Sequence, residues 1–352
     1  MSALQPFSAL LSVVDPDYNK SFEVEELTRE NRLLKATARL AKRNGLYYWF
    51  IQRLIESGVA LPAGQDGPWQ QEKERLAEFK RTVMLINSLS RDYGIDYILI
   101  KGCDTVPNVP RDVDILVRVE DSERIYRALA DYGAKCFYSG PVEASFLIAG
   151  CIKLDIYCGI SYLGMDFVDG TLLWNSRVEK EIFGISYCGL NQEADFLSFL
   201  PHTLFGHRSM TLLDFLHLKH LRKEIKDIEL CREYAYRQGW GAAFDSSLTL
   251  LSSLATRIYE KRKTVSFPYL FKRDFMLKCA SALDKVELGT RQKLFFSISL
   301  GLDWFSDKLM KSPFYESLAS FGVGRKAYNL LNYFVRSMRG DRHGMPGKRG
   351  EP

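Results

Sequence analysis

The chain has 352 residues, of which 46% are hydrophobic and 26% are charged, and its formal net charge at pH 7 is +5. This composition is that of an ordinary soluble globular protein with roughly two to three domains. It excludes a chain that is disordered throughout, and the small net charge does not by itself demand a nucleic-acid partner.

The seven cysteines form no Cys-x-x-Cys pair and lie mostly in apolar contexts, which predicts reduced thiols rather than a disulfide framework. The N-terminus has no basic segment before its short apolar run, so it does not resemble a signal peptide. The longest apolar stretch near the C-terminus is shorter than the roughly 20 residues that a membrane span needs. We therefore expect a cytoplasmic protein with no membrane span.

The first region in chain order, residues 1–92, is predicted to be helical, with helices over 23–45, 46–58 and 72–94 and a polar loop over 62–71. The first helix begins with acidic residues, ends with basic ones and stops at Gly45, as helix termini prefer. Four of its basic side chains recur at three- and four-residue spacing, namely Arg32, Lys35, Arg39 and Arg43. This spacing is typical of a solvated helix face, and a polyanion-binding face is the alternative.

The second region, residues 93–190, alternates between strands and a helix. Strands are predicted over 95–100, 112–119, 134–138, 151–157 and 184–190. A helix over 122–133 is expected to begin with Ser122 as N-cap and to end at Gly133. Residues 191–335 are again predicted to be helical, and residues 336–352 form a basic, Gly/Pro-rich tail that we expect to be disordered. The fold class is therefore α+β or α/β, a small mixed sheet flanked by N-terminal and C-terminal helical regions.

Two predicted strands carry carboxylates among apolar residues. Side chains alternate across a strand, so Asp112 and Asp114 share one face, while Val113, Ile115 and Val117 point to the other. Like charges that are close together and partly removed from water repel each other and lose solvation energy. A positive group must therefore lie beside them, or the strand must end in solvent, where the carboxylates would merely cap it near Arg111 and Arg118.

The segment "CIKLDIY" adds a third carboxylate to the same small sheet. Its apolar residues Ile152, Leu154 and Ile156 share one face, which leaves Lys153, Asp155 and Tyr157 on the other. Magnesium prefers oxygen ligands and is usually held by one or two carboxylates plus substrate phosphates. Two such ions can stabilise both ends of an in-line displacement at phosphorus. The three aspartates therefore predict a Mg²⁺ or Mn²⁺ site, and Gly102 at the preceding strand end would let a phosphate chain approach the backbone.

These motifs resemble the nucleotidyltransferase superfamily with the polymerase-beta-like fold. Its pattern is a strand that ends in Gly-Gly or Gly-Ser, then Asp-x-Asp/Glu between hydrophobic residues, then a later Asp or Glu on a strand. "LIKGC", "RDVDILV" and "KLDIY" stand in that order here. The chain is nearer to a family of uncharacterised nucleotidyltransferases that carry Lys-Gly before Arg and Asp-Ile-Asp-Leu-Leu-Val. The segment "NQEADFLSFLPHTLFGHRSMTLLDFLHLKHL" is similar to that family's region after the sheet. The resemblance covers roughly residues 20–245 and is strongest over 95–220.

The resemblance implies roles for individual residues. Asp112 and Asp114 would bind both metal ions, and Asp155 would complete the catalytic metal site and help to deprotonate an attacking hydroxyl. The nucleoside triphosphate would be bound by residues that lie before the Asp-x-Asp pair: Lys101, Gly102, Cys103 and Arg111. Cys103 stands where the superfamily has Gly or Ser, and the short loop to Asp112 contains Pro107 and Pro110.

The implied activity is a magnesium-dependent transfer of a nucleotidyl group from a nucleoside triphosphate to a hydroxyl, with release of pyrophosphate. The acceptor could be a small molecule, an RNA or a protein side chain. One alternative is a toxin-like nucleotidyltransferase that acts on tRNA, and another is a non-catalytic protein that binds a nucleotide or RNA.

Four histidines lie within a short stretch of the C-terminal helical region: His202, His207, His217 and His220. A zinc site is conceivable, but no Cys or carboxylate completes a ligand spacing, so packing and surface roles are expected. Alternatively, His202, His207 and Asp214 could border the substrate cleft, because their segment follows the sheet directly.

Overall fold

The structure is a computed structural model of the chain, and it describes residues 5–18, 27, 30–59, 61, 64–102, 105–140, 143–162, 165–207, 209–260 and 269–270. Cys103 and the predicted tail over 336–352 lie outside these ranges.

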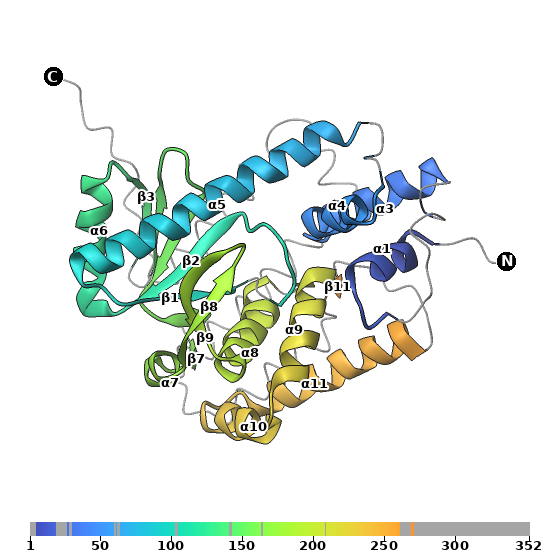
Figure 1. Cartoon of the computed structure of the whole chain (residues 1–352). Coiled ribbons are helices and arrows are strands. Elements are labelled where there is room, and N and C mark those ends of the chain that lie inside the picture. Colours follow the sequence, from blue (N-terminus) through green and yellow to red (C-terminus); the bar gives the residue numbers. More distant parts are fainter. Residues whose placement is uncertain are drawn as a thin grey trace, which may run out of the picture.

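A five-stranded mixed sheet lies in the left half of the described fold as seen in Figure 1. Its strands lie in the order β1 (Tyr97–Ile100), β2 (Asp112–Val117), β5 (Lys153–Tyr157), β4 (Glu143–Leu147) and β3 (Lys135–Ser139). β2 and β5 are parallel, and the other neighbouring pairs are antiparallel. With helices before and after it in the chain, the sheet confirms the predicted α+β class.

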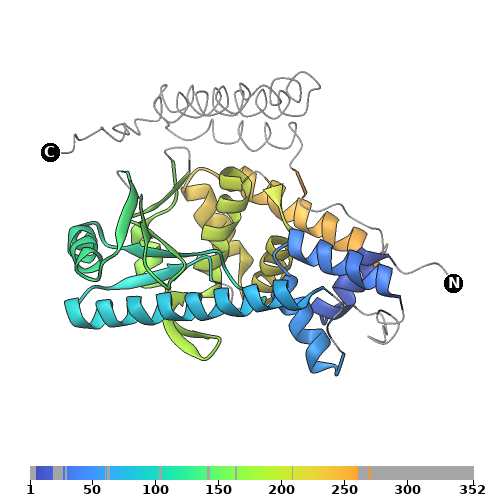
Figure 2. The same cartoon turned by 90° about the horizontal axis from the view of Figure 1, so that it is seen from above.

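One face of the sheet is covered by the long helix α5 (Asp66–Tyr93) and by α6 (Ser122–Asp131). In Figure 1 α5 runs diagonally across the sheet, and Figure 2 shows it along one side of the whole molecule. The apolar residues of β2 and of the stretch 152–156 lie in this core, as the alternation of side chains predicts: Val113, Ile115, Val117, Ile152, Leu154 and Ile156.

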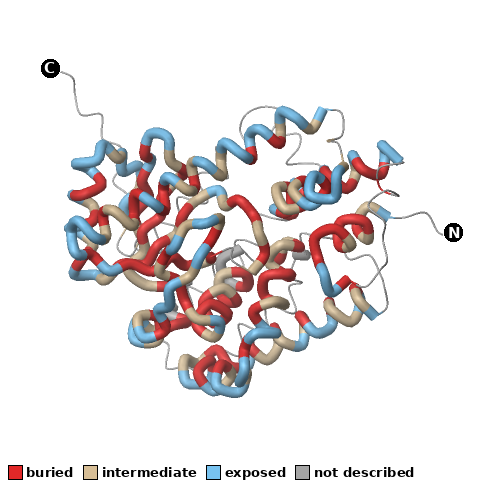
Figure 3. The backbone as a smooth tube through the Cα atoms, in the orientation of Figure 1, coloured by how far each residue is buried: buried red, intermediate tan, exposed pale blue. Residues whose placement is uncertain are grey.

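The opposite face contributes to a core that helices from both ends of the chain form together. The N-terminal ones are α1 (Pro6–Val14), α3 (Asn31–Arg43) and α4 (Tyr47–Glu56). The C-terminal ones are α8 (Gln192–Pro201), α9 (Leu212–Glu224), α10 (Ile228–Arg237) and α11 (Gly241–Ala255). Buried residues from all of these helices form one continuous core with Ile98, Ile100 and Leu116 of the sheet, and Figure 3 shows the buried sides of the helices facing inward. The two helical regions thus share a core across the chain.

Smaller elements complete the described chain: η1 (Val119–Asp121), the hairpin of β6 (Ile160–Tyr162) and β7 (Met165–Val168), α7 (Gly170–Asn175), the hairpin of β8 (Arg177–Ile182) and β9 (Ile185–Leu190), the π-helical turns η2 (His202–His207) and η3 (Thr256–Glu260), and the pair β10 (Ser209–Met210) and β11 (Tyr269–Leu270).

Polar contacts join the N-terminal helical region to α9. The Lys219 ammonium lies 2.8 Å from Oδ2 of Asp15, whose side chain is fully buried at the end of α1. At the turn between α3 and α4, the Asn44 side-chain oxygen accepts a hydrogen bond of 3.0 Å from the backbone N–H of Leu212. Gly45, with a φ of +74°, lets this turn approach Leu213 closely, as a helix-terminating glycine allows. The contacts of Asn44 and Gly45 hold the α3–α4 turn against the start of α9.

The described structure corrects three predictions about local elements. Helix α5 begins at Asp66 rather than at residue 72, because Pro68 falls in its first turn, where a missing N–H costs no helical hydrogen bond. Ser122 is not an N-cap; its hydroxyl donates to the carbonyl of Val119, and Asp121 precedes the helix. Strand β4 and the strands β6 to β8 were not predicted, because they are short and lack a long alternating pattern.

The described cysteines are free thiols, and the exposure of the basic face on α3 fits both a solvated face and a polyanion-binding face. The described cysteines 136, 151, 158, 188 and 231 are free. The side chains of Arg32, Lys35, Arg39 and Arg43 on α3 are exposed. Within the part of the chain that the structure describes, no helix is long and apolar enough to span a membrane.

We predict that Lys219→Met destabilises the protein by about 3 kcal/mol, because it leaves the buried charge of Asp15 without its cation. Urea denaturation at pH 7 measures the change. Lys223→Met is the matched control: Lys223 contacts Asp17, is 59% exposed, and should cost much less. In the double variant Asp15→Asn/Lys219→Met most of the loss should be recovered, and equal losses in the two lysine variants would contradict the assignment.

Candidate active site

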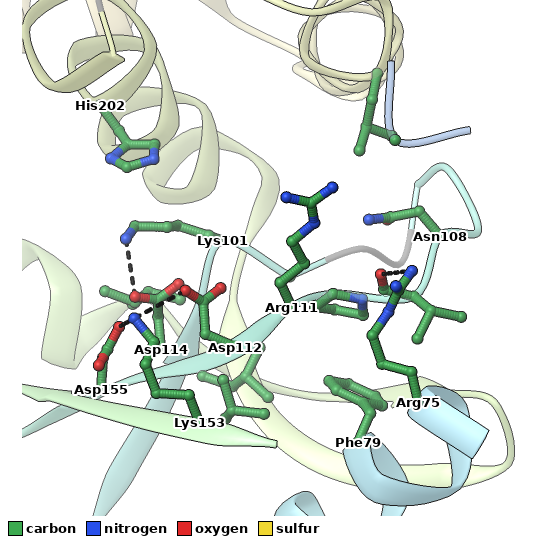
Figure 4. Close-up of a pocket in the computed structure, with 18 of the residues that line it drawn as sticks. Arg75, Phe79, Lys101, Asn108, Arg111, Asp112, Asp114, Lys153, Asp155 and His202 are labelled. Carbon is green, nitrogen blue, oxygen red and sulfur yellow. Dashed lines mark hydrogen bonds and ion pairs between the residues drawn. The ribbon is translucent and has the colours of Figure 1, made fainter. Parts of the chain in front are cut away.

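A cavity of about 580 Å³ opens on the sheet face that carries the three aspartates (Figure 4). Its walls come from the α3–α4 turn, α5, the end of β1 and the loop after it, β2, β4, β5, η2 and α9. The volume lies within the range of small-molecule binding pockets. Segments that are far apart in sequence therefore meet at one place.

The parallel pairing of β2 with β5 brings the predicted carboxylates together. Asp114 lies opposite Asp155, and Asp112 lies opposite Lys153. Paired residues on neighbouring strands point to the same face, so all four side chains line the cavity. Asp155 is buried, with an exposed fraction of 3%, and Asp112 is more open.

Lys153 connects two of the carboxylates. Its Nζ lies 2.5 Å from Oδ2 of Asp155 and 3.1 Å from Oδ2 of Asp112. Partial burial lowers the pKa of Lys153, but the hydrogen bonds and charges of Asp155 and Asp112 outweigh this effect and leave the pKa raised. The other oxygen of Asp155 accepts a hydrogen bond of 2.6 Å from the Ser145 hydroxyl. Both oxygens of Asp155 therefore accept hydrogen bonds within the sheet.

Lys101 neutralises the remaining carboxylate. Its Nζ lies 2.9 Å from Oδ1 of Asp114 and 4.9 Å from the centre of the Tyr157 ring. Burial raises the pKa of Asp114, the charge of Lys101 opposes the rise, and the charge of Asp112 adds to it. The backbone of Lys101 is left-handed, with a φ of +57°, and Gly102 follows it at the cavity wall. The expected positive groups beside the aspartates are thus two lysines.

Two further cavity residues, Glu143 and Tyr157, add polar groups near the aspartates. They lie opposite each other on β4 and β5. Burial raises the pKa of Glu143, and the charge of Asp155 adds to the rise. Burial also raises the pKa of the Tyr157 hydroxyl far above its ordinary value. Strand alternation predicts Tyr157 on this face, whereas Glu143 lies on a strand that the sequence pattern does not predict.

The other half of the cavity is basic. Arg75 comes from α5, Lys42 from the end of α3, and Asn108 and Arg111 from the loop before β2. Figure 4 shows Arg111 between the aspartates and this second half. The structure therefore places three of the four predicted nucleotide-binding residues, Lys101, Gly102 and Arg111, at the cavity.

Of the histidine segment, His202 borders the cavity from η2, across from Lys101 (Figure 4). His217 is buried; its ring contacts the Thr105 hydroxyl and stacks edge-on against Phe199 at 4.5 Å. Asp214 is not a cleft residue: it forms a reciprocal capping box with Thr211 at the start of α9. The side chain of His207 is outside the described part of the structure. His217 thus has the expected packing role, while His202 faces the site.

The chemistry of the carboxylates fits a divalent cation. Asp112 and Asp155 both contact the same ammonium group, so their oxygens can reach one common cation. Among the described residues, no group of three or more His, Cys, Asp or Glu is arranged to hold a metal ion. The Lys153 ammonium lies between Asp112 and Asp155, so a cation that binds both carboxylates would have to displace it.

Comparisons with known proteins show two matches among solved structures. The lincosamide antibiotic adenylyltransferase LnuA with bound lincomycin is 18% identical, with a TM-score of 0.33, and covers 42% of this chain and 98% of its own. The antibiotic-resistance factor ANT(2'')-Ia is 14% identical, with a TM-score of 0.35, and covers 51% of this chain and 98% of its own. No protein-family model and no curated protein sequence matches the chain. Similarity at this level carries no argument about activity.

We predict that Lys101→Met lowers the free energy of unfolding by about 3 kcal/mol at pH 7, because it leaves the Asp114 carboxylate buried beside other carboxylates. Adding Asp114→Asn should recover most of this loss. A double-mutant cycle by urea denaturation gives the coupling energy between the two side chains. Strictly additive changes would show that the two groups are not paired.

Proposed function

We propose that the protein is a nucleotidyltransferase that uses Mg²⁺ or Mn²⁺ to move a nucleotidyl group from a nucleoside triphosphate to a hydroxyl acceptor. The observation that carries the proposal is the arrangement of Asp112, Asp114 and Asp155 on adjacent parallel strands, facing one cavity beside the Lys101–Gly102 turn. A simple strand cap would not need two partly buried lysine–carboxylate pairs at the wall of a cavity this large.

In the proposed reaction, the acceptor oxygen forms a bond to the α-phosphorus, and the bond between the α-phosphorus and the bridging oxygen to the β-phosphorus breaks. Pyrophosphate leaves with that electron pair, and the hydroxyl proton passes to a base. Asp112, Asp114 and Asp155 would hold the metal, which would neutralise charge on the phosphate oxygens. Lys101 and the backbone at Gly102 would orient the phosphate chain.

Glu143 is the better candidate for the base. Asp155 already accepts hydrogen bonds at both of its oxygens, from Ser145 and Lys153. Glu143 lines the same cavity, and its raised pKa makes it a stronger proton acceptor than an ordinary carboxylate. We therefore assign metal binding to Asp155 and proton transfer to Glu143.

We predict that Asp112→Asn and Asp114→Asn each abolish nucleotidyl transfer without unfolding the protein. Loss of a like charge among the three aspartates should keep or slightly raise the melting temperature. The assay incubates pure protein and cell extract with α-phosphate-labelled triphosphates and follows the label. Glu123→Gln on the exposed surface of α6 is a control that should keep full transfer. Full transfer by either Asp variant would refute the metal assignment.

We also predict that Lys153→Met binds Mn²⁺ about tenfold more tightly than the wild type in the absence of nucleotide, because the ammonium no longer competes for Asp112 and Asp155. Paramagnetic resonance of free Mn²⁺ measures the affinity directly. Lys73→Met, on the exposed side of α5, should bind Mn²⁺ as the wild type does.

Saturating Mn²⁺ and triphosphate should raise the melting temperature of the wild type, because ligands that bind the folded state stabilise it. In Asp155→Ala this rise should be absent.

Two results would count against this prediction. Equal Mn²⁺ affinity in Lys153→Met and the wild type would show that the ammonium does not occupy the cation position. If neither protein binds metal or triphosphate at millimolar concentration, the metal-dependent reaction itself is contradicted.

A further inference from the structure

The basic half of the cavity contains buried polar groups that have no partner in the described structure. The side chain of Asn108 is buried, at 6% exposed, and lines the cavity. Its Oδ1 has no hydrogen-bond partner among the described residues. Most buried polar side-chain atoms in proteins are hydrogen-bonded, so an exception at a cavity wall points to a ligand. Since the oxygen and nitrogen of an amide can be exchanged, Asn108 can offer an acceptor or a donor there.

Arg75 adds a second group of this kind. One of its terminal nitrogens donates to Glu72 and, at 3.4 Å, to the carbonyl of Val109. These contacts orient the guanidinium at the wall of the cavity, next to Asn108 (Figure 4). Its Nε–H is buried and has no acceptor within the described ranges. Protein contacts therefore fix the position of the Arg75 guanidinium, and its Nε–H is left to donate to a ligand.

Arg111 and Lys42 supply unneutralised charge. Both are exposed residues that line the cavity, and neither forms an ion pair with another described residue. Lys101 and Lys153, by contrast, are paired with the aspartates. In the basic half, Glu72 is the carboxylate that faces Arg75, so Lys42 and Arg111 leave a surplus of positive charge. Cationic donors with free N–H groups bind phosphate or carboxylate oxygens.

We propose that Lys42, Arg75, Asn108 and Arg111 form an anion subsite that binds a phosphate or carboxylate group of a substrate. The inference rests on the proposed function, because it assigns the second half of the same cavity. The anion could be the phosphate tail of the nucleoside triphosphate or an anionic group on the acceptor. In either case the N-terminal helices α3 and α5 contribute substrate-binding residues, and the contact between Asn44 and Leu212 holds the α3–α4 turn in place.

Asn108→Asp is the sharpest test variant, because it keeps the shape of the side chain and adds a negative charge to the subsite. Arg111→Gln removes a positive charge from an exposed side chain and should not affect folding. Arg43→Gln is the matched control, since Arg43 is an exposed neighbour of Lys42 on α3 that does not line the cavity. Circular dichroism and thermal melting show whether each variant is folded.

Isothermal titration calorimetry of the full chain measures binding of two probes, tripolyphosphate and glucose 6-phosphate. We expect at least tenfold weaker binding of one probe in Asn108→Asp, about tenfold weaker binding in Arg111→Gln, and no change in Arg43→Gln. Loss for tripolyphosphate, with a parallel loss for the nucleoside triphosphate, identifies the nucleotide tail as the ligand. Loss for glucose 6-phosphate, with triphosphate binding unchanged, identifies an anionic acceptor.

Wild-type affinity for both probes in both variants, or no binding of either probe to the wild type, would overturn the anion subsite. These outcomes are separate from failure of the proposed function. If the wild type transfers label but the variants bind the anion as the wild type does, the transferase proposal stands and the subsite is refuted. If the variants lose anion binding but the wild type transfers no label, the subsite stands and the transferase proposal is refuted.

Discussion

The parallel pairing of β2 with β5 is the constraint on which the rest of the site depends. It places Asp114 directly opposite Asp155 on one face of the sheet, with Asp112 two residues away on β2, opposite Lys153. Neighbouring strands lie about 4.8 Å apart, so the sheet alone would hold like charges close together and away from water. The fold tolerates this only because Lys101 and Lys153 bring compensating charge to the same place.

The two lysines satisfy this constraint in different ways. Lys101 reaches Asp114 from the end of β1. The side chain of Lys101 is 19% exposed, and that of Asp114 is 11% exposed. Lys153 stands on the same strand as Asp155, two residues away, and bridges to the next strand. A bound cation would compete with Lys153 for the Oδ2 atoms of Asp112 and Asp155. Lys101, by contrast, can stay paired with Asp114 and still offer positive charge to a phosphate.

The apolar half of the fold was largely predictable from the sequence, because alternation of side chains decides which face of a strand is buried. Val113 and Ile115 lie in one core and the aspartates face the other side, as the pattern requires. The position of Glu143 could not be predicted, because the five residues of β4 have no clear strand pattern and form a strand by pairing with β5. Nor could Asn108 and Arg75 be recognised, because a proline-containing loop and an amphipathic helix do not reveal which polar side chain meets a distant cavity.

The left-handed backbone at Lys101 has a consequence for redesign of this protein. Glycine or asparagine adopts that conformation at lower cost than lysine, so a search for stabilising substitutions by backbone statistics would replace Lys101 early. The same substitution would strip the counter-charge from Asp114. Consensus or stability-guided engineering of this chain should therefore hold position 101 fixed, because the loss of the ion pair with Asp114 would offset the relief of backbone strain.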